Sequence, residues 1–204
     1  MNLKKISILT RFLEINGNTM KLKFNLITLK LSLFILLLSS GFIFAQGEGE
    51  VRISPKAKVE QVVGFTTVTV DYSRPGVKGR EIWGGLVPYN VVWRAGANEA
   101  TKITFSDNVL INGKSLKAGS YSFFTIPTKD KWTIIFNRVA DQWGAFEYNE
   151  EEDVLRLQVK PETNSDCWQE WLAYTITKTS DKSAIVRLEW EKLKIPFTVE
   201  VNIN

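Results

Sequence analysis

The sequence predicts an all-β protein: an antiparallel β-sandwich, jelly-roll-like, with about nine or ten strands. Apolar side chains recur at every second position along most of the chain after residue 50, which is typical of strands with one buried face and one face toward water. Turn-forming residues separate these segments at the spacing expected of a sandwich. No segment carries an apolar stripe of helical period and helical length.

The strands can be followed along the chain. The alternating segments are 67–72, 102–105, 155–160, 172–177, 186–190 and 195–203. Segments 119–127 and 132–137 are apolar on both faces, which predicts central strands of a sheet. Asn112-Gly113 separates 109–111 from 114–116 and predicts a two-residue hairpin with a type I′ turn.

Residues 1–45 are predicted to be an N-terminal extension and a signal peptide rather than part of the fold. A basic stretch precedes an uncharged apolar run from Leu31 to Ala45, which is shorter than the ~20 residues of a membrane-spanning helix. Met20 is the predicted start, and the predicted cleavage follows Ala45. Residues 46–204 then form a single domain, exported to the periplasm or the extracellular space and without a membrane span. An uncleaved N-terminal anchor is the alternative.

The charge of the predicted mature chain argues against nucleic-acid binding. The whole sequence has 26 Lys and Arg against 22 Asp and Glu, but residues 1–45 hold six of the basic residues and one acid. The remaining 20 basic and 21 acidic residues give a net charge of −1, whereas nucleic-acid-binding domains are strongly basic.

Residue usage also limits the chemistry. The chain has no histidine, which excludes Ser-His-Asp and Cys-His catalysis and histidine-ligated metals. Its one cysteine, Cys167, is expected to be a small hydrophobe without a disulfide partner. The acidic run 149–153 lacks the oxygen spacing of a calcium loop and predicts a solvated turn before a strand. We expect no metal, no cofactor and no catalytic residue.

Three loop-rich stretches, 72–80, 93–99 and 137–148, bring arginines, amides, carboxylates and tryptophans to predicted strand ends. Such groups can form a polar pocket for a small anionic ligand or a carbohydrate, with bidentate hydrogen bonds from the guanidinium groups. The predicted binding residues are Arg74, Arg80, Arg94, Asn98, Glu99 and Trp143.

Three alternatives to this exported binding module stay open. Arg74 or Arg94 could pair with Asp71, Glu81 or Glu99 while Trp83, Trp93 and Trp143 plug the end of the sandwich. Glu99 and a second acid could hydrolyse envelope carbohydrate, since that mechanism needs no histidine. Exposed strand edges could make the protein a structural envelope or interaction subunit.

Several motifs resemble those of one family. They are Ser54-Pro55-Lys56-Ala57, Val70 to Pro75, Lys78-Gly79-Arg80, Trp93 to Glu99, Ala118 to Ser122, and Gln142-Trp143-Gly144. Together they resemble the Domain of Unknown Function 2911 family, exported proteins of Bacteroidetes-type bacteria, over roughly Ser54 to the C-terminus. The resemblance implies export, one domain and an uncharacterised role, and it implies no catalytic or binding residues.

Overall fold

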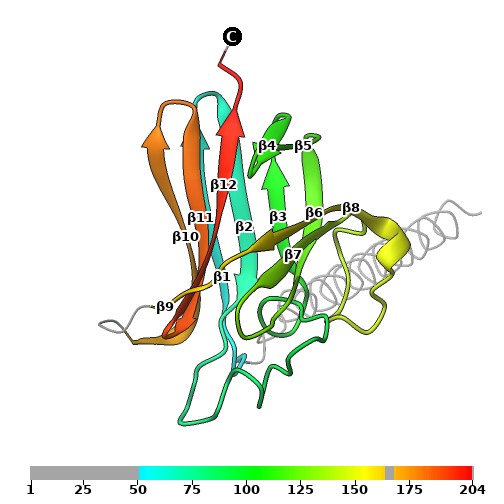
Figure 1. The fold of residues 1–204 in the computed structure, drawn as a ribbon, viewed down its shortest axis with the longest axis vertical. Coiled ribbons are helices and arrows are strands. Elements are labelled where there is room, and N and C mark those ends of the chain that lie inside the picture. The colour runs from blue at the N-terminus through cyan, green and yellow to red at the C-terminus, as the bar shows by residue number, and fades with distance from the viewer. Residues whose placement is uncertain (1–50, 164–167, 204) are drawn as a thin grey trace, which may run out of the picture. The chain divides into compact units, whose positions relative to one another are not determined.

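The computed structural model describes residues 51–163 and 168–203, which form two antiparallel β-sheets (Figure 1). The predicted all-β class and the two-sheet arrangement are confirmed. The predicted extension and signal peptide, residues 1–45, and Cys167 lie outside the described residues.

The first sheet has six strands in the order β1-β2-β3-β6-β7-β8. Its strands are β1 (Lys56–Val63), β2 (Thr66–Ser73), β3 (Thr101–Phe105), β6 (Gly119–Ile126), β7 (Trp132–Asn137) and β8 (Asp153–Val159). The segments predicted to be central, 119–127 and 132–137, become β6 and β7 and have neighbours on both sides. A 3₁₀ turn, Glu150–Glu152, capped by the Asn149 side chain, precedes β8 where a solvated acidic turn is predicted.

The second sheet has the order β10-β11-β12-β4-β5, with β9 paired to β12. Its strands are β4 (Val109–Ile111), β5 (Lys114–Leu116), β9 (Glu162–Thr163), β10 (Gln169–Ser180), β11 (Ser183–Glu191) and β12 (Leu193–Val201). The β4–β5 hairpin leaves the first sheet to pair with β12, and the chain then returns to β6. Its turn residues Asn112 and Gly113 have φ of 45° and 77°, as the predicted type I′ turn requires.

The twelve strands found within residues 51–163 and 168–203 exceed the nine or ten that the sequence predicts. Part of the difference is β9, which has two exposed residues and no apolar alternation. A strand of this length is held only by its pairing with β12, so local sequence carries no signal for it.

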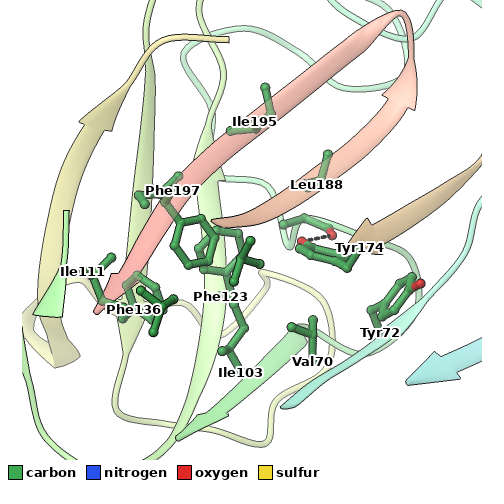
Figure 2. Packing of buried hydrophobic residues seen from close by; sticks show 14 of the residues in the cluster. Val70, Tyr72, Ile103, Ile111, Phe123, Phe136, Tyr174, Leu188, Ile195 and Phe197 are labelled. Carbon is green, nitrogen blue, oxygen red and sulfur yellow. Dashed lines mark hydrogen bonds between the residues drawn. The ribbon is translucent and has the colours of Figure 1, made fainter. Parts of the chain in front are cut away.

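The core lies between the sheets and is built from the inward side chains of both (Figure 2). Phe123 and Phe136 of the first sheet pack against Phe197 of the second, with ring centroids 5.5 and 5.8 Å from it. Tyr72 and Tyr174 meet across the sheets at 4.8 Å. These positions alternate with outward residues along each strand, so the registers bring the outward residues of neighbouring strands side by side, and on β6 and β7 these include the apolar Phe124 and Ile135.

Four tryptophans close one end of the core. The rings of Trp83 and Trp132 are 4.9 Å apart, and Trp93 stacks on Trp190 at 5.9 Å. Trp83 and Trp93 therefore act as the plug that the sequence offers as an alternative, whereas Trp143 remains 58% exposed. The long connection between β2 and β3, at the foot of Figure 1, supplies two of these rings.

Candidate functional site

A row of polar side chains crosses the outer face of the first sheet at one level. Register pairs its members strand by strand: Lys58, Asp71, Lys102, Ser122, Asn137 and Asp153. Their sequence neighbours Val70, Ile103 and Phe123 point into the core, so these side chains point outward. Ser122 and Asn137 are nonetheless fully buried, because the loop of residues 138–149, the platform loop, covers them.

A groove of about 520 Å³ opens over one half of this row. It lies between strands β1 to β3 on one side and residues 140–142 of the platform loop on the other. Its charged lining residues are three lysines and three acids: Lys56, Lys58, Lys102, Asp71, Glu99 and Asp141. The groove therefore carries charges of both signs and has no net formal charge.

Ion pairs order the wall around Glu99. The Arg52 guanidinium lies 2.7 Å and the Lys56 ammonium 3.1 Å from its carboxylate oxygens. The hydrogen bond from Arg52, with the help of Lys56, lowers the pKa of Glu99 from 4.5 to about 2. Glu99 is consequently ionised throughout the neutral range and presents a hydrogen-bond acceptor to the groove.

The opposite wall is held in a similar way. Lys102 Nζ lies 2.9 Å from Asp141 Oδ1, and this contact raises the pKa of Lys102. Lys102 sits beside Asp71 in the register, and Asp71 in turn lies opposite Lys58. Acceptors and donors thus alternate along the floor of the groove.

The platform loop is fixed at its centre and at both ends. Gln142 Nε2 donates to Ser122 Oγ and to the Val139 carbonyl, at 3.0 and 2.9 Å, while Ala100 N donates to the Gln142 carbonyl at 3.0 Å. Asn137 binds the Asn149 carbonyl at 2.9 Å. These bonds tie the loop to β6, β7 and the chain before β3.

The carboxyl-terminal end of the loop is anchored by a buried acid. Asp153, whose side chain is 4% exposed, accepts hydrogen bonds from Asn137 at 2.8 Å and from the Tyr148 hydroxyl at 2.5 Å. Burial and the Asp153 contact raise the pKa of Tyr148. On this fixed loop Trp143 and Phe146 stay exposed, at 58% and 84%.

A bulge at residues 95–100 shapes the adjoining rim. Ala95 and Asn98 have φ of 53° and 58°, in the left-handed region that non-glycine residues rarely adopt. Two buried hydroxyls hold this conformation, because Thr101 Oγ1 and the Tyr174 hydroxyl both donate to the Ala95 carbonyl, at 3.0 and 2.9 Å. Asn98 Nδ2 donates to the Ser54 carbonyl at 3.2 Å.

Two predicted arginines tie the backbone rather than facing the groove. Arg74 Nε donates to the Leu172 carbonyl of β10 at 2.8 Å. Arg80 donates to the carbonyls of Gly76 and Val77, at 2.6 and 3.1 Å. Arg74 therefore links the two sheets and Arg80 holds its own loop, and Arg74 pairs with no acid of the described residues, contrary to the alternative interpretation.

The remaining predicted residues gather near the rim. Glu99 is the one predicted residue that lines the groove, and Trp143 pairs with it in a short backbone bridge. Asn98 holds the bulge, and Arg94 precedes it. Sequence reasoning missed the groove lysines, Asp71, Asp141 and Gln142. A usable signal was present in the outward positions of adjacent strands, where Asp71 and Lys102 alternate with core residues.

These features define a class: a two-sheet, all-β protein with a charge-balanced polar groove on one outer face and an exposed aromatic beside it. Within the described ranges, no cluster of acids, cysteines or histidines is arranged to hold a metal ion. The same part of the chain contains no helix of the length and apolarity needed to cross a membrane.

The chain belongs to the family described as protein of unknown function (DUF2911), which matches residues 54–199. The resemblance predicted from the motifs is therefore confirmed. A search of the curated proteins finds no significant match, and a search of the solved structures finds none.

Proposed function

We propose that the protein is an exported binding module that holds a carbohydrate in the groove on the first sheet, with Trp143 stacking against a sugar ring. The observation that carries this proposal is the exposed Trp143 paired to Glu99 at the rim of a groove with balanced donors and acceptors.

The groups that line the groove are chemically complementary to those of a sugar. A sugar presents hydroxyls that both donate and accept, together with an apolar C–H face. The carboxylates of Asp71 and Glu99 accept, the Lys58 ammonium donates, and an indole ring packs on the apolar face. A groove with no net charge suits a polyol better than a small multivalent anion.

The fixed platform loop supports the same conclusion. A tryptophan that merely filled space would be expected inside, since burying a large apolar side chain stabilises the fold by about 2–3 kcal/mol. Here the loop is anchored through Gln142 and Asn137, yet it leaves the indole in water. A rigid, exposed aromatic loses little conformational entropy when a ligand stacks on it.

Thermal-shift and calorimetric binding measurements on the purified protein, with a panel of neutral and acidic oligosaccharides, test the proposal. A bound saccharide raises the melting temperature. Trp143→Ala should weaken binding about tenfold, or ~1.4 kcal/mol. Trp168→Ala is the matched control, because Trp168 is 52% exposed and lies outside the groove.

The proposal fails if no saccharide shifts the melting temperature, or if Trp143→Ala and Trp168→Ala bind alike. The hydrolase alternative is less well supported. Asp71 and Asp141 do share the groove with Glu99, but a glycosidase needs one carboxyl that stays protonated. Glu99, with a pKa of about 2, does not supply that proton.

A further inference from the structure

Arg94 differs from every other arginine of the described chain. Of the seven at residues 51–163 and 168–203, Arg94 is the one whose guanidinium makes no hydrogen bond or ion pair with another described residue. Its side chain is half-buried, and its Nε atom is fully buried without a partner.

A half-buried guanidinium without a partner is unfavourable. Loss of hydration disfavours the charged form, and burial accordingly lowers the pKa of Arg94 from its ordinary value. An unmade hydrogen bond at a buried donor adds to the free-energy cost. Most buried polar groups in proteins are satisfied, so a buried donor with no partner in the described chain is available to a partner from outside it, either an ordered water or a ligand.

Strand alternation places the Arg94 side chain on the same outer face as the groove. Trp93 points into the core, where it stacks on Trp190, so the next residue points outward. Trp93 pairs with Thr125, which sets Arg94 beside outward-facing Phe124 of β6. The Arg94 carbonyl accepts a hydrogen bond from Thr101 N at 3.2 Å.

A second unsatisfied atom lies next to the same backbone. Gln142 lines the groove, and its Oε1 is buried without a partner although its Nε2 makes two hydrogen bonds. The carbonyls of Gln142 and Arg94 accept hydrogen bonds from the consecutive amides of Ala100 and Thr101. Arg94 itself is outside the groove lining, but its carbonyl and that of Gln142 bind neighbouring amides, so an unpaired cationic donor and an unpaired neutral acceptor lie on adjoining backbone beside the groove residue Ala100.

We propose that the saccharide is acidic, with its carboxylate bound by Arg94 and a nearby hydroxyl donating to Gln142 Oε1. This inference rests on the proposed function and names the ligand class, a uronic-acid-containing glycan. One sugar unit of that kind carries both complementary groups, an anionic acceptor and a hydroxyl donor. The pairing of a guanidinium with a carboxylate is also strong and directional.

Calorimetry with the purified full-length protein tests the assignment, using a galacturonic acid tetramer and its fully methyl-esterified form as probes. The wild type should bind the acid at least tenfold more tightly than the ester. Arg94→Gln should abolish this preference, because it weakens binding of the acid to the level of the ester. Arg187→Gln is the matched control, because Arg187 is also half-buried but lies on β11 of the second sheet.

The outcomes separate the two proposals. Equal binding of acid and ester by the wild type, or an acid preference that survives Arg94→Gln, would overturn the inference while saccharide binding still stands. If neither probe binds and no neutral saccharide binds, the proposed function itself fails. Loss of the preference in Arg187→Gln as well would also overturn it, because the effect would then follow net charge and not the site.

Discussion

Arg74 and Arg94 lie at comparable places in the first sheet but have different surroundings. Arg74 lies just beyond β2, and Arg94 lies in the connection that leads to β3. Arg74 donates to the Leu172 carbonyl and fastens one sheet to the other. Arg94 has a buried Nε without a partner. The difference shows that composition at a strand end does not identify an arginine that ties the backbone. The hydrogen bonds of its guanidinium identify it.

The largest expected effect is the difference in unfolding free energy between a variant that lacks the Arg74 guanidinium and one that lacks the Arg94 guanidinium. Arg74→Ala should lower the free energy of unfolding by about 2 kcal/mol, because backbone carbonyls lose a charged donor. Arg94→Met should leave it unchanged or raise it by up to about 1 kcal/mol, since no partner is lost. Urea unfolding of both variants measures this. Equal destabilisation would remove the contrast between the two arginines.

The bulge beside Arg94 provides a second, smaller test. Tyr174→Phe should cost about 1 kcal/mol of unfolding free energy, because the Ala95 carbonyl loses a buried hydrogen bond. Tyr72→Phe is the control, since its ring lies 4.8 Å from Tyr174 and no hydrogen bond of its hydroxyl is found among the described residues. A cost in Tyr72→Phe equal to that in Tyr174→Phe would contradict the role given to the Ala95 contact.

The platform loop can be strained without touching Arg94. Gly144 has φ of 68°, and a Cβ there would lie 2.9 Å from the Phe146 ring. Gly113 has φ of 77°, and a Cβ there would meet nothing within 4 Å. Alanine at either position should cost about 1 kcal/mol for the left-handed backbone. Thermal unfolding should show the greater loss for Gly144→Ala, because the ring must also move, and the reverse order would contradict this.

The smallest effect concerns pH. Because the pKa of Glu99 is lowered from 4.5 to about 2, its ion pairs stabilise the fold above pH 4.5 and lose this effect as pH falls toward 2. The carboxylate is partly exposed, so Glu99→Gln should cost less than about 1 kcal/mol at pH 7. The difference between the two proteins should shrink as pH falls through 2 and disappear below it. An NMR titration of Glu99 with a midpoint near 4.5 would contradict this.

The two β-sheets could be predicted from the sequence, whereas most residues of the groove could not. Period-two alternation predicts half-buried strands because each inward side chain contributes to one core, and β11 follows this pattern at all nine positions. The groove escaped prediction because Lys58, Asp71 and Lys102 are ordinary outward residues of three strands. Only the registers bring them to one level, and registers are long-range information.

Whether a predicted site residue reaches the groove depends on its local backbone conformation and hydrogen bonds. Glu99 lines the groove because the left-handed backbone at Asn98 turns the chain at the rim. Arg80 was indistinguishable in sequence, but its guanidinium folds back onto the Gly76 carbonyl. Trp143 was assigned either to a pocket or to a plug. Its exposure rules out the plug, while its part in binding stays a prediction.

The tryptophan cluster has an optical consequence. Indole rings as close as those of Trp83 and Trp132, at 4.9 Å, exchange excitation energy and, shielded from water, emit at short wavelength. Trp143, in contact with solvent, emits further to the red. Excitation at the red edge of the absorption band therefore favours the surface rings, and a saccharide covering Trp143 would dim and blue-shift that component. Because Trp168 and Trp171 are also exposed, at 52% and 37%, the part of the change that is lost in Trp143→Ala would report occupancy of the groove without an attached dye.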